Sequence, residues 1–303
     1  MTQVPTAISV VIPLYNKAAY VREAVESVLA QDTTAAEIIV VDDGSTDGGA
    51  ELLRGMAPGQ LRCITQANAG VSAARNRGVA EARGTIVAFL DADDRYRPGY
   101  LAAIAALVQQ FPQAGMFATG YRCFWPDGRD EVRLLPPKGA IRLVSDFYRH
   151  WAELSFTCAS SIAVRTLALR ALDSQFPVGE RLGEDQDVWF RLAESHPLAY
   201  DARPLVDYRM DVNGSATSSG SLVELLPCYL RLGERLDTGR VPQDLRHGAR
   251  RLLASHYINV ARSNLRQGLQ REALALLRNQ RARGNPVYWL RSWALALLAR
   301  GRA

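Results

Sequence analysis

The chain has 303 residues, of which 48% are apolar and 22% charged, and its formal net charge is +5. This composition suffices for one large or two modest hydrophobic cores. No stretch reaches the roughly 18 to 20 uninterrupted apolar residues that a membrane-spanning helix needs. The first residues lack the basic and apolar segments of a secretory signal, and the four cysteines form no Cys-x-x-Cys pair. We therefore expect a cytoplasmic protein without a zinc or redox centre.

The charge is distributed unevenly along the chain. Residues 1–220 contain 21 Lys and Arg against 26 acidic residues, a balance of −5, whereas residues 221–303 contain 15 Arg against 5 acidic residues, a balance of +10. Such asymmetry predicts two modules with different partners. The basic module would suit an anionic lipid surface or the acidic face of its own body. Because no recognised nucleic-acid-binding module is present, we expect no nucleic-acid partner.

The first part of the chain alternates predicted strands and helices on short loops. Asn16 is placed to cap the first of these helices. This alternation predicts an α/β fold with a doubly wound, mostly parallel, Rossmann-like sheet, and right-handed crossovers would bring the loops after its strands to one edge. The expected strands are 8–13, 37–41, 61–64 and 85–90, and the expected helices are 18–31, 48–56 and 71–82.

The order of elements is less regular after Pro98. Ser215–Ser221 is rich in Ser, Gly and Thr and predicts a boundary, beyond which we expect helices only. Before that boundary we expect a helix at 99–110, a strand at 114–119, a hairpin at 121–135, a helix at 142–150, a strand at 160–164, a helix from Glu184 and a strand at 204–210.

Three carboxylates follow the predicted strand at 85–90. They are Asp91, Asp93 and Asp94, and they stand at the carboxyl end of the strand, where open α/β sheets place their ligands. Carboxylates so crowded repel one another unless a cation lies among them. A Mg²⁺-type ion fits, because such sites combine one or two carboxylates with substrate phosphates. The alternative is a solvated acidic turn.

Five segments together resemble the inverting family 2 glycosyltransferases with a GT-A fold. The likeness extends over about residues 6–217, and the five segments come in the family's order. No single one of them is specific. The segments are Val10–Lys17, Val40–Gly48, Asn68–Gly78, Phe89–Asp94 and Gly183–Trp189.

This resemblance implies a domain organisation and an activity. It implies a GT-A domain over residues 1–217, with a nucleotide-binding half at about 1–98 and an acceptor half at about 99–217, followed by a basic helical region at 221–303. The implied reaction moves a sugar from a UDP or dTDP donor to a hydroxyl of a surface glycan or lipid-linked acceptor. It depends on Mg²⁺ or Mn²⁺ and inverts the anomeric carbon.

The nucleotide base has candidate contacts after the first two strands. The resemblance assigns Pro13, Tyr15 and Asp43 to the base; Tyr15 can stack on a ring, and Asp43 can accept the imide N–H of uracil or thymine. Alternatively, Tyr15 is an ordinary strand-end aromatic and Asp43 a turn residue. The guanidinium of Arg75 suits a base carbonyl or a phosphate, or else forms a surface ion pair with Asp43 or Glu81.

The diphosphate and the metal are expected at the acidic cluster. Asp91 and Asp93 fit the family's Asp-x-Asp motif, and Asp94 remains a candidate ligand. Many relatives have Tyr-Arg-x-His near the end of the domain, whereas this chain has Asp211 at the His position. Asp211 can still bind a cation but cannot donate to phosphate as an imidazolium does. Arg209 would then supply the positive charge.

The catalytic base is expected in the segment Gly183–Trp189. A carboxylate there can take the proton of the attacking sugar hydroxyl. The family motif puts the base at Asp185, and Glu184 and Asp187 are its competitors. The alternative is an acidic helix amino terminus that interacts favourably with the helix dipole.

The last segment, Val287–Arg300, is apolar with Arg at intervals and contains Tyr288, Trp289 and Trp293. These aromatic residues suit a membrane interface, which would place the protein peripherally at the inner membrane face. The alternative is a helix docked on its neighbours or on the second subunit of a homodimer.

Two other functions remain open at this point. A nucleotidyltransferase would need a glycine-rich loop after the first strand, but Leu14–Lys17 has no glycine. A non-catalytic nucleotide-sugar-binding or scaffold protein of a polysaccharide assembly complex would be expected to lack the Asp cluster or Asp185, and both are present.

Overall fold

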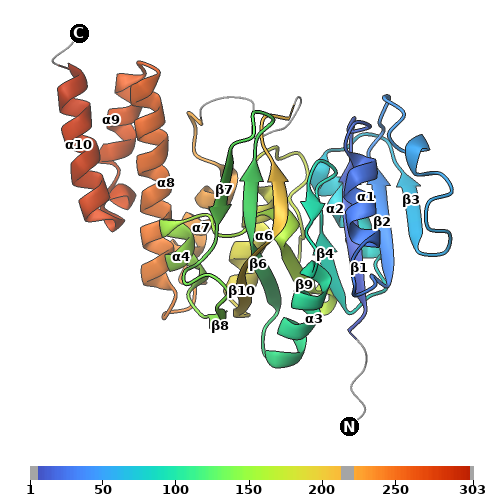
Figure 1. Cartoon of the computed structure of the whole chain (residues 1–303). Helices are drawn as coiled ribbons and strands as arrows, with labels where there is room; N and C mark the ends of the chain where they lie inside the picture. Colours follow the sequence, from blue (N-terminus) through green and yellow to red (C-terminus); the bar gives the residue numbers. More distant parts are fainter. Residues whose placement is uncertain (1–5, 213–221, 301–303) are drawn as a thin grey trace. The chain divides into compact units, whose positions relative to one another are not determined.

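The structure, a computed structural model, describes residues 6–212 and 222–300 and divides into two compact units (Figure 1). The first unit comprises the chain up to Ser145 and again from Ser155 to Val212, and the second comprises Asp146–Leu154 and the residues from 222 onward. This division differs from the predicted domains, which place residues 146–154 in the acceptor half of the first domain. The predicted boundary Ser215–Ser221 lies outside the described residues.

A single sheet with the strand order β3-β2-β1-β4-β9-β6-β10-β5 organises the first unit. Its first part is parallel, as predicted, and its other part is mixed: β6 and β10 are parallel, and β9 runs antiparallel between β4 and β6. The predicted α/β class is therefore confirmed. The strands are β1 (Ile8–Leu14), β2 (Glu37–Asp42), β3 (Leu61–Thr65), β4 (Ile86–Phe89), β5 (Arg95–Tyr96), β6 (Met116–Phe124), β7 (Asp130–Arg133), β8 (Ile141–Val144), β9 (Ile162–Arg165) and β10 (Leu198–Arg209).

Helices pack on this sheet through small and apolar side chains. The predicted apolar stripe of α1 is buried at Val21, Ala24, Val25 and Val28. Gly78 allows α2 to lie close to β1, because a Cβ at this position would stand 2.3 Å from Cγ1 of Val11. The helices are α1 (Val21–Leu29), α2 (Val71–Glu81), α3 (Tyr100–Gln110), α5 (Thr166–Arg170) and α6 (Glu184–Ala193), with 3₁₀ turns at Glu51–Leu53 and Ala159–Ser161.

Two expectations about the first helices are wrong. Helix α1 begins at Val21 without a side-chain cap, and Asn16 instead accepts the N–H of Thr46 at 2.9 Å, which joins the loops after β1 and β2. The helix expected at 48–56 is only a 3₁₀ turn, since the glycines at both ends, Gly48 and Gly55, adopt positive φ.

The helix expected at 142–150 is wrong in its first half and confirmed from Phe147 onward. Strand β8 (Ile141–Val144) pairs with β10, and helix α4 (Phe147–Glu153) follows it. Asp146 separates the two, because its carboxylate accepts the N–H of Arg149 at 2.9 Å and caps the helix. The β-branched Ile141 and Val144 favour the strand.

Helices alone form the described part of the second unit, as predicted. Helix α8 (Arg246–Arg266) contacts α4 (Phe147–Glu153), α7 (Pro227–Asp237), α9 (Gln270–Arg278) and α10 (Pro286–Arg300). The aromatic side chains Phe147, Tyr148 and Trp151 of α4 are buried, which explains why this helix belongs to the second unit. No helix in the described residues is long and apolar enough to cross a membrane.

Candidate functional site

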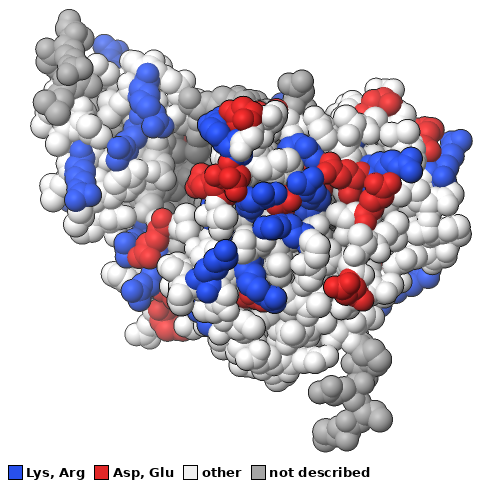
Figure 2. Space-filling view, in the orientation of Figure 1, with Lys and Arg blue, Asp and Glu red and all other residues white. Residues whose placement is uncertain are grey.

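The loops after β1, β2 and β4 meet at one edge of the sheet. The three strands are parallel neighbours, with Leu14 beside Asp42 and Val11 beside Phe89, so their carboxyl ends face the same way. Figure 2 shows Lys and Arg side chains lying among Asp and Glu side chains on the visible face of the first unit. The predicted gathering of the first, second and acidic loops is confirmed.

Asp43 organises the loop after β2. Its buried carboxylate accepts N–H groups from Gln66 at 2.8 Å, Ala69 at 3.0 Å and Gly70 at 2.7 Å. It therefore holds the loop that leads into α2. Pro13 is buried within β1, whereas Tyr15, two residues further on, is half-exposed at the edge.

The three aspartates of the acidic loop have different partners. Asp91 accepts a hydrogen bond from Arg75 at 2.8 Å, and Asp93 pairs with Nζ of Lys17 at 2.8 Å. Asp94 is buried and accepts from the hydroxyl of Ser160 at 2.5 Å and from the Arg209 N–H at 2.9 Å. Protein cations thus offset the repulsion that the sequence predicts.

Burial, together with the neighbouring Asp93 and Asp91, raises the pKa of Asp94 well above its usual value. Both oxygens of Asp94 are engaged and its side chain is shielded from solvent. These bonds join the acidic loop to the turn before β9 and to the end of β10, and the metal-ligand role predicted for Asp94 stays a prediction. Ser160, which also accepts the N–H of Asp91 at 3.0 Å, lies in the 3₁₀ turn before β9.

A divalent cation fits two of the predicted ligands. Among the described residues, no three His, Cys, Asp or Glu side chains converge as a metal site. A Mg²⁺-type ion, however, takes only one or two carboxylates when substrate phosphates supply further oxygens. Asp91 and Asp93 retain 26% and 16% side-chain exposure and offer hard oxygen donors. Asp211 is exposed, in left-handed backbone conformation at φ 56°, two residues beyond Arg209.

Arg209 lies against the acidic loop, as predicted. Besides the N–H bond to Asp94, its Nε donates to the carbonyl of Asp93 at 3.0 Å, and its guanidinium pairs with Glu23. The guanidinium also lies over the ring of Phe124, 4.7 Å from the ring centroid. Arg209 thus adds positive charge to the loop while fixing the end of β10 against it.

Arg75 is buried, so the alternative of a surface ion pair is wrong, whereas its predicted contact with the donor stays a prediction. It is 3% exposed and donates to Asp91 and to Glu184, each at 2.8 Å. Neither predicted surface partner applies, because Asp43 holds its own loop and Glu81 pairs with Arg62 and Arg77. Burial opposes the charge of Arg75, but the surrounding carboxylates outweigh it and raise its pKa above the ordinary value.

Asp185 differs from the two acids beside it at the start of α6. Glu184 is buried against Arg75, and buried Asp187 pairs with Arg191 at 2.9 Å. Asp185 is only partly buried, and its carboxylate accepts the Gln186 N–H at 2.7 Å. Burial and then the charge of Glu184 raise the pKa of Asp185 to about 7, against the opposing effect of Arg75. A carboxylate with this pKa can accept a proton near neutral pH.

The sequence-based assignment missed three contacts of the site. These are the ion pair of Lys17 with Asp93, the hydrogen bond of Ser160 to Asp94 and the ion pair of Glu184 with Arg75. Lys17 stands in the first motif, and its position after a strand end offered a signal. Ser160 offered none, because its place beside Asp94 depends on the antiparallel insertion of β9 between β4 and β6.

The fold is similar to that of solved structures. The chain superposes on S. aureus TarS 1-349 in complex with UDP-GlcNAc with a TM-score of 0.70 and 18% identity, over 98% of this chain and 92% of that one. It superposes on the same protein in complex with UDP with a TM-score of 0.65 and 19% identity, over 98% and 91%. The likeness shows a shared fold of the predicted GT-A type.

Sequence comparison gives the family. An uncharacterized glycosyltransferase of Nostoc is 45% identical over 112 residues, and an uncharacterized glycosyltransferase of Escherichia coli, YibD, is 48% identical over 93 residues. The alignments cover 36% and 30% of this chain, and only 35% and 27% of those relatives. The model of "Glycosyl transferase family 2" matches residues 9–171, more than half of the sequence. The chain belongs to glycosyltransferase family 2.

Proposed function

We propose that this chain transfers a sugar from a nucleoside diphosphate sugar, of the UDP or dTDP type, to a hydroxyl group of a surface glycan or a lipid-linked acceptor. One observation carries the proposal: Arg75 joins Asp91 in the acidic loop directly to Glu184, the neighbour of Asp185. A group suited to bind the donor and a group suited to deprotonate the acceptor therefore stand at one site. The similar TarS structures with UDP-GlcNAc and UDP support this class of donor.

The base of the donor would lie between the loops after β1 and β2. Tyr15 is 50% exposed there and offers a ring for stacking. An ionised carboxylate has about four acceptor positions, and the three N–H groups of Gln66, Ala69 and Gly70 leave one of them for the imide N–H of uracil or thymine. Adenine and cytosine lack a ring N–H at this edge, and the N1–H of guanine lies between a carbonyl and an amino group rather than two carbonyls, so we expect uracil and thymine nucleotides to be preferred.

Departure of the nucleoside diphosphate creates negative charge that the site must stabilise. Lys17 stands at the acidic loop, 2.8 Å from Asp93, and can turn its ammonium to a phosphate oxygen. Asp91 and Asp93 would hold Mg²⁺ or Mn²⁺, which when bound supplies Lewis-acid stabilisation of the leaving group. Asp211 is a further candidate for contact with the ion.

Attack by the acceptor needs a proton acceptor on the opposite side of the sugar. Asp185 is partly exposed and not held in an ion pair within the described part of the chain, so it can take the proton of the acceptor hydroxyl. A single base opposite the leaving group implies one displacement with inversion at the anomeric carbon.

The donor class can be tested by nucleotide binding. In calorimetry with Mn²⁺, we expect UDP or dTDP to bind at least about tenfold more tightly than ADP and GDP, and Tyr15→Ala to weaken the pyrimidine complex by about 1 kcal/mol or more through lost stacking. Equal affinity for purine and pyrimidine diphosphates would contradict the assignment of the base to Asp43 and Tyr15.

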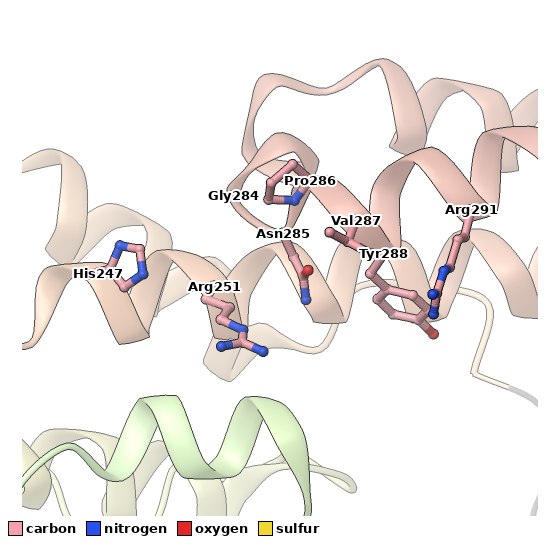
Figure 3. A pocket seen from close by; sticks show the side chains of 8 residues that line it. All are labelled: His247, Arg251, Gly284, Asn285, Pro286, Val287, Tyr288 and Arg291. Carbon is pink, nitrogen blue, oxygen red and sulfur yellow. The ribbon is translucent and has the colours of Figure 1, made fainter.

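The second unit has a surface suited to an anionic membrane. Val287, Leu290 and Leu297 are about 60% exposed and share one face of α10, together with the exposed Arg291. Beside them is a hollow of about 530 Å³. Figure 3 shows that Arg291 and Tyr288 of α10 reach it from one side and that His247 and Arg251 come from α8.

Charge decides which partner this surface fits. The residues from 221 onward carry a balance of +10, so the same module of a second copy would be repelled, whereas anionic lipid would be attracted. The apolar side chains would enter the headgroup region while Arg291 faces lipid phosphates. We therefore propose peripheral contact of α10 with an anionic membrane, such as the inner membrane face.

Co-sedimentation with liposomes tests this contact. The full chain should sediment with anionic liposomes at low salt, sediment less as salt rises, and ignore neutral liposomes. Leu290→Gln with Leu297→Gln should abolish binding, whereas Leu167→Gln, at an 81% exposed position on α5, should not. If the wild type ignores anionic liposomes and instead sediments as a dimer in ultracentrifugation, α10 is a dimerisation element.

A further inference from the structure

Arg75 connects two parts of the site that are far apart in sequence. One terminal nitrogen donates to Oδ1 of Asp91 in the acidic loop. The other donates to Oε1 of Glu184 at the start of α6, which is 109 residues after Arg75 in the sequence. Both bonds measure 2.8 Å. The side chain of Arg75 is only 4% exposed, and that of Glu184 is 9% exposed. The guanidinium is therefore enclosed by protein and held between two carboxylates.

The surroundings of Arg75 hold it rigidly. Its guanidinium lies 5.5 Å from the centre of the Phe176 ring, which packs edge-on against Phe89 and Trp189. The next residue of α2, Asn76, donates to the carbonyl of Phe176 at 2.8 Å and accepts its N–H at 2.9 Å. Helix α2 thus holds the cluster of Phe89, Phe176 and Trp189 through Asn76, and it holds Asp91 and Glu184 through Arg75.

We propose that Arg75 is a positioning residue that fixes the start of α6 against the acidic loop, so that Asp185 faces the donor held at Asp91 and Asp93. This inference rests on the proposed function and changes the role predicted for Arg75 from contact with the donor to alignment of the catalytic base. A planar guanidinium can hold two carboxylates at fixed angles at the same time, whereas an ammonium is a single point of charge. The bridge therefore requires arginine.

The two roles predict opposite kinetic results. A donor-binding arginine contributes to affinity, so its replacement should weaken UDP binding. A positioning arginine leaves the donor contacts in place but misaligns the base, and a displacement of about 1 Å can reduce the rate about 10²-fold. Arg75→Lys separates the roles because it keeps the buried positive charge and removes the two-pronged bond.

The experiment measures UDP affinity and turnover in the same variants. For Arg75→Lys, calorimetry with Mn²⁺ should give a UDP dissociation constant within about threefold of wild type and an unchanged stoichiometry, while kcat falls at least about tenfold. Glu184→Gln, which loses the charge but keeps the shape of the partner, should act in the same direction. Arg77→Lys is the matched control on α2, since Arg77 is 52% exposed and pairs with Glu81 on the same helix.

Every outcome of these measurements either supports or contradicts the positioning role of Arg75. A UDP affinity that falls about as far as kcat would show that Arg75 contacts the donor, and full activity of both Arg75→Lys and Glu184→Gln would show that the bridge is dispensable. Should Arg75→Lys not fold, a reduced binding stoichiometry will reveal it, and Glu184→Gln then carries the test. Wild-type protein without turnover of any nucleotide sugar would refute the proposed function itself, while leaving the UDP affinity of the variants measurable.

Discussion

Asp185→Asn is expected to abolish sugar transfer while leaving the fold and the donor affinity intact. The amide has nearly the shape of the carboxylate but cannot accept the proton of the acceptor hydroxyl, and loss of a general base typically costs 10² to 10⁴ in rate. We therefore expect kcat to fall at least about 100-fold, measured as release of UDP in the presence of acceptor. The dissociation constant for UDP should remain within about threefold of wild type.

The pH dependence of the wild type should report the same group. Because burial and Glu184 raise the pKa of Asp185 to about 7, the base is protonated and inactive below this pH. Transfer should thus rise with pH through about 7 and level off above it. The residual activity of Asp185→Asn should lack this rise.

Asp187→Asn provides the contrast. Asp187 is buried and binds Arg191, which in turn donates to the carbonyls of Ser174 and Gln175. Its replacement should lower the melting temperature, because it loosens this segment, but preserve kcat in the folded protein. If Asp187→Asn is the inactive variant and Asp185→Asn remains active, the base is assigned to the wrong carboxylate.

Asp93→Asn is expected to remove the cation-dependent part of donor binding. In wild type, UDP affinity should be at least about tenfold higher with Mn²⁺ than with excess chelator, because the ion would join Asp91 and Asp93 to the diphosphate. In Asp93→Asn the two affinities should become equal. Calorimetry measures both, and the control is Asp127→Asn, whose side chain is 56% exposed in the turn between β6 and β7.

The same experiment addresses Lys17. Lys17 pairs with Asp93 at 2.8 Å, so a divalent ion at Asp93 must displace this ammonium from the carboxylate. If wild-type UDP binding is unaffected by chelator, Lys17 and Arg75 neutralise the loop by themselves, and transfer without a divalent ion would follow.

The sequence predicted the framework of the site because strand ends are local features. The apolar runs at β1, β2 and β4 end in polar residues, and parallel strands bring these ends together whatever the rest of the chain does. Several of the wrong predictions concern residues whose partners lie far away in the sequence. Asn16 is of a residue type that commonly caps helices, but its side-chain oxygen accepts the N–H of Thr46, 30 residues away, in a contact that only the tertiary fold creates.

The partners of the charged residues could not be predicted for a related reason. Arg75 was expected at a ligand or on the surface, and its partner Glu184 belongs to a helix 109 residues later in the chain. The pairing depends on how α6 packs against α2, which is determined by aromatic contacts such as Phe176 with Trp189. Likewise, helix α4 joins the second unit because it contacts α8, a helix much later in the chain, and no feature of the loop around α4 signals this.

Turnover of nucleotide sugars tests the central claim most directly. Wild type and Asp185→Asn would each be incubated with a panel of UDP- and dTDP-sugars and Mn²⁺ or Mg²⁺, and release of the nucleoside diphosphate would be followed. The account predicts that wild type releases diphosphate from at least one pyrimidine donor and that Asp185→Asn loses this activity while still binding the nucleotide. Equal release by the two proteins, or tight nucleotide binding without release by wild type from any donor, would contradict it.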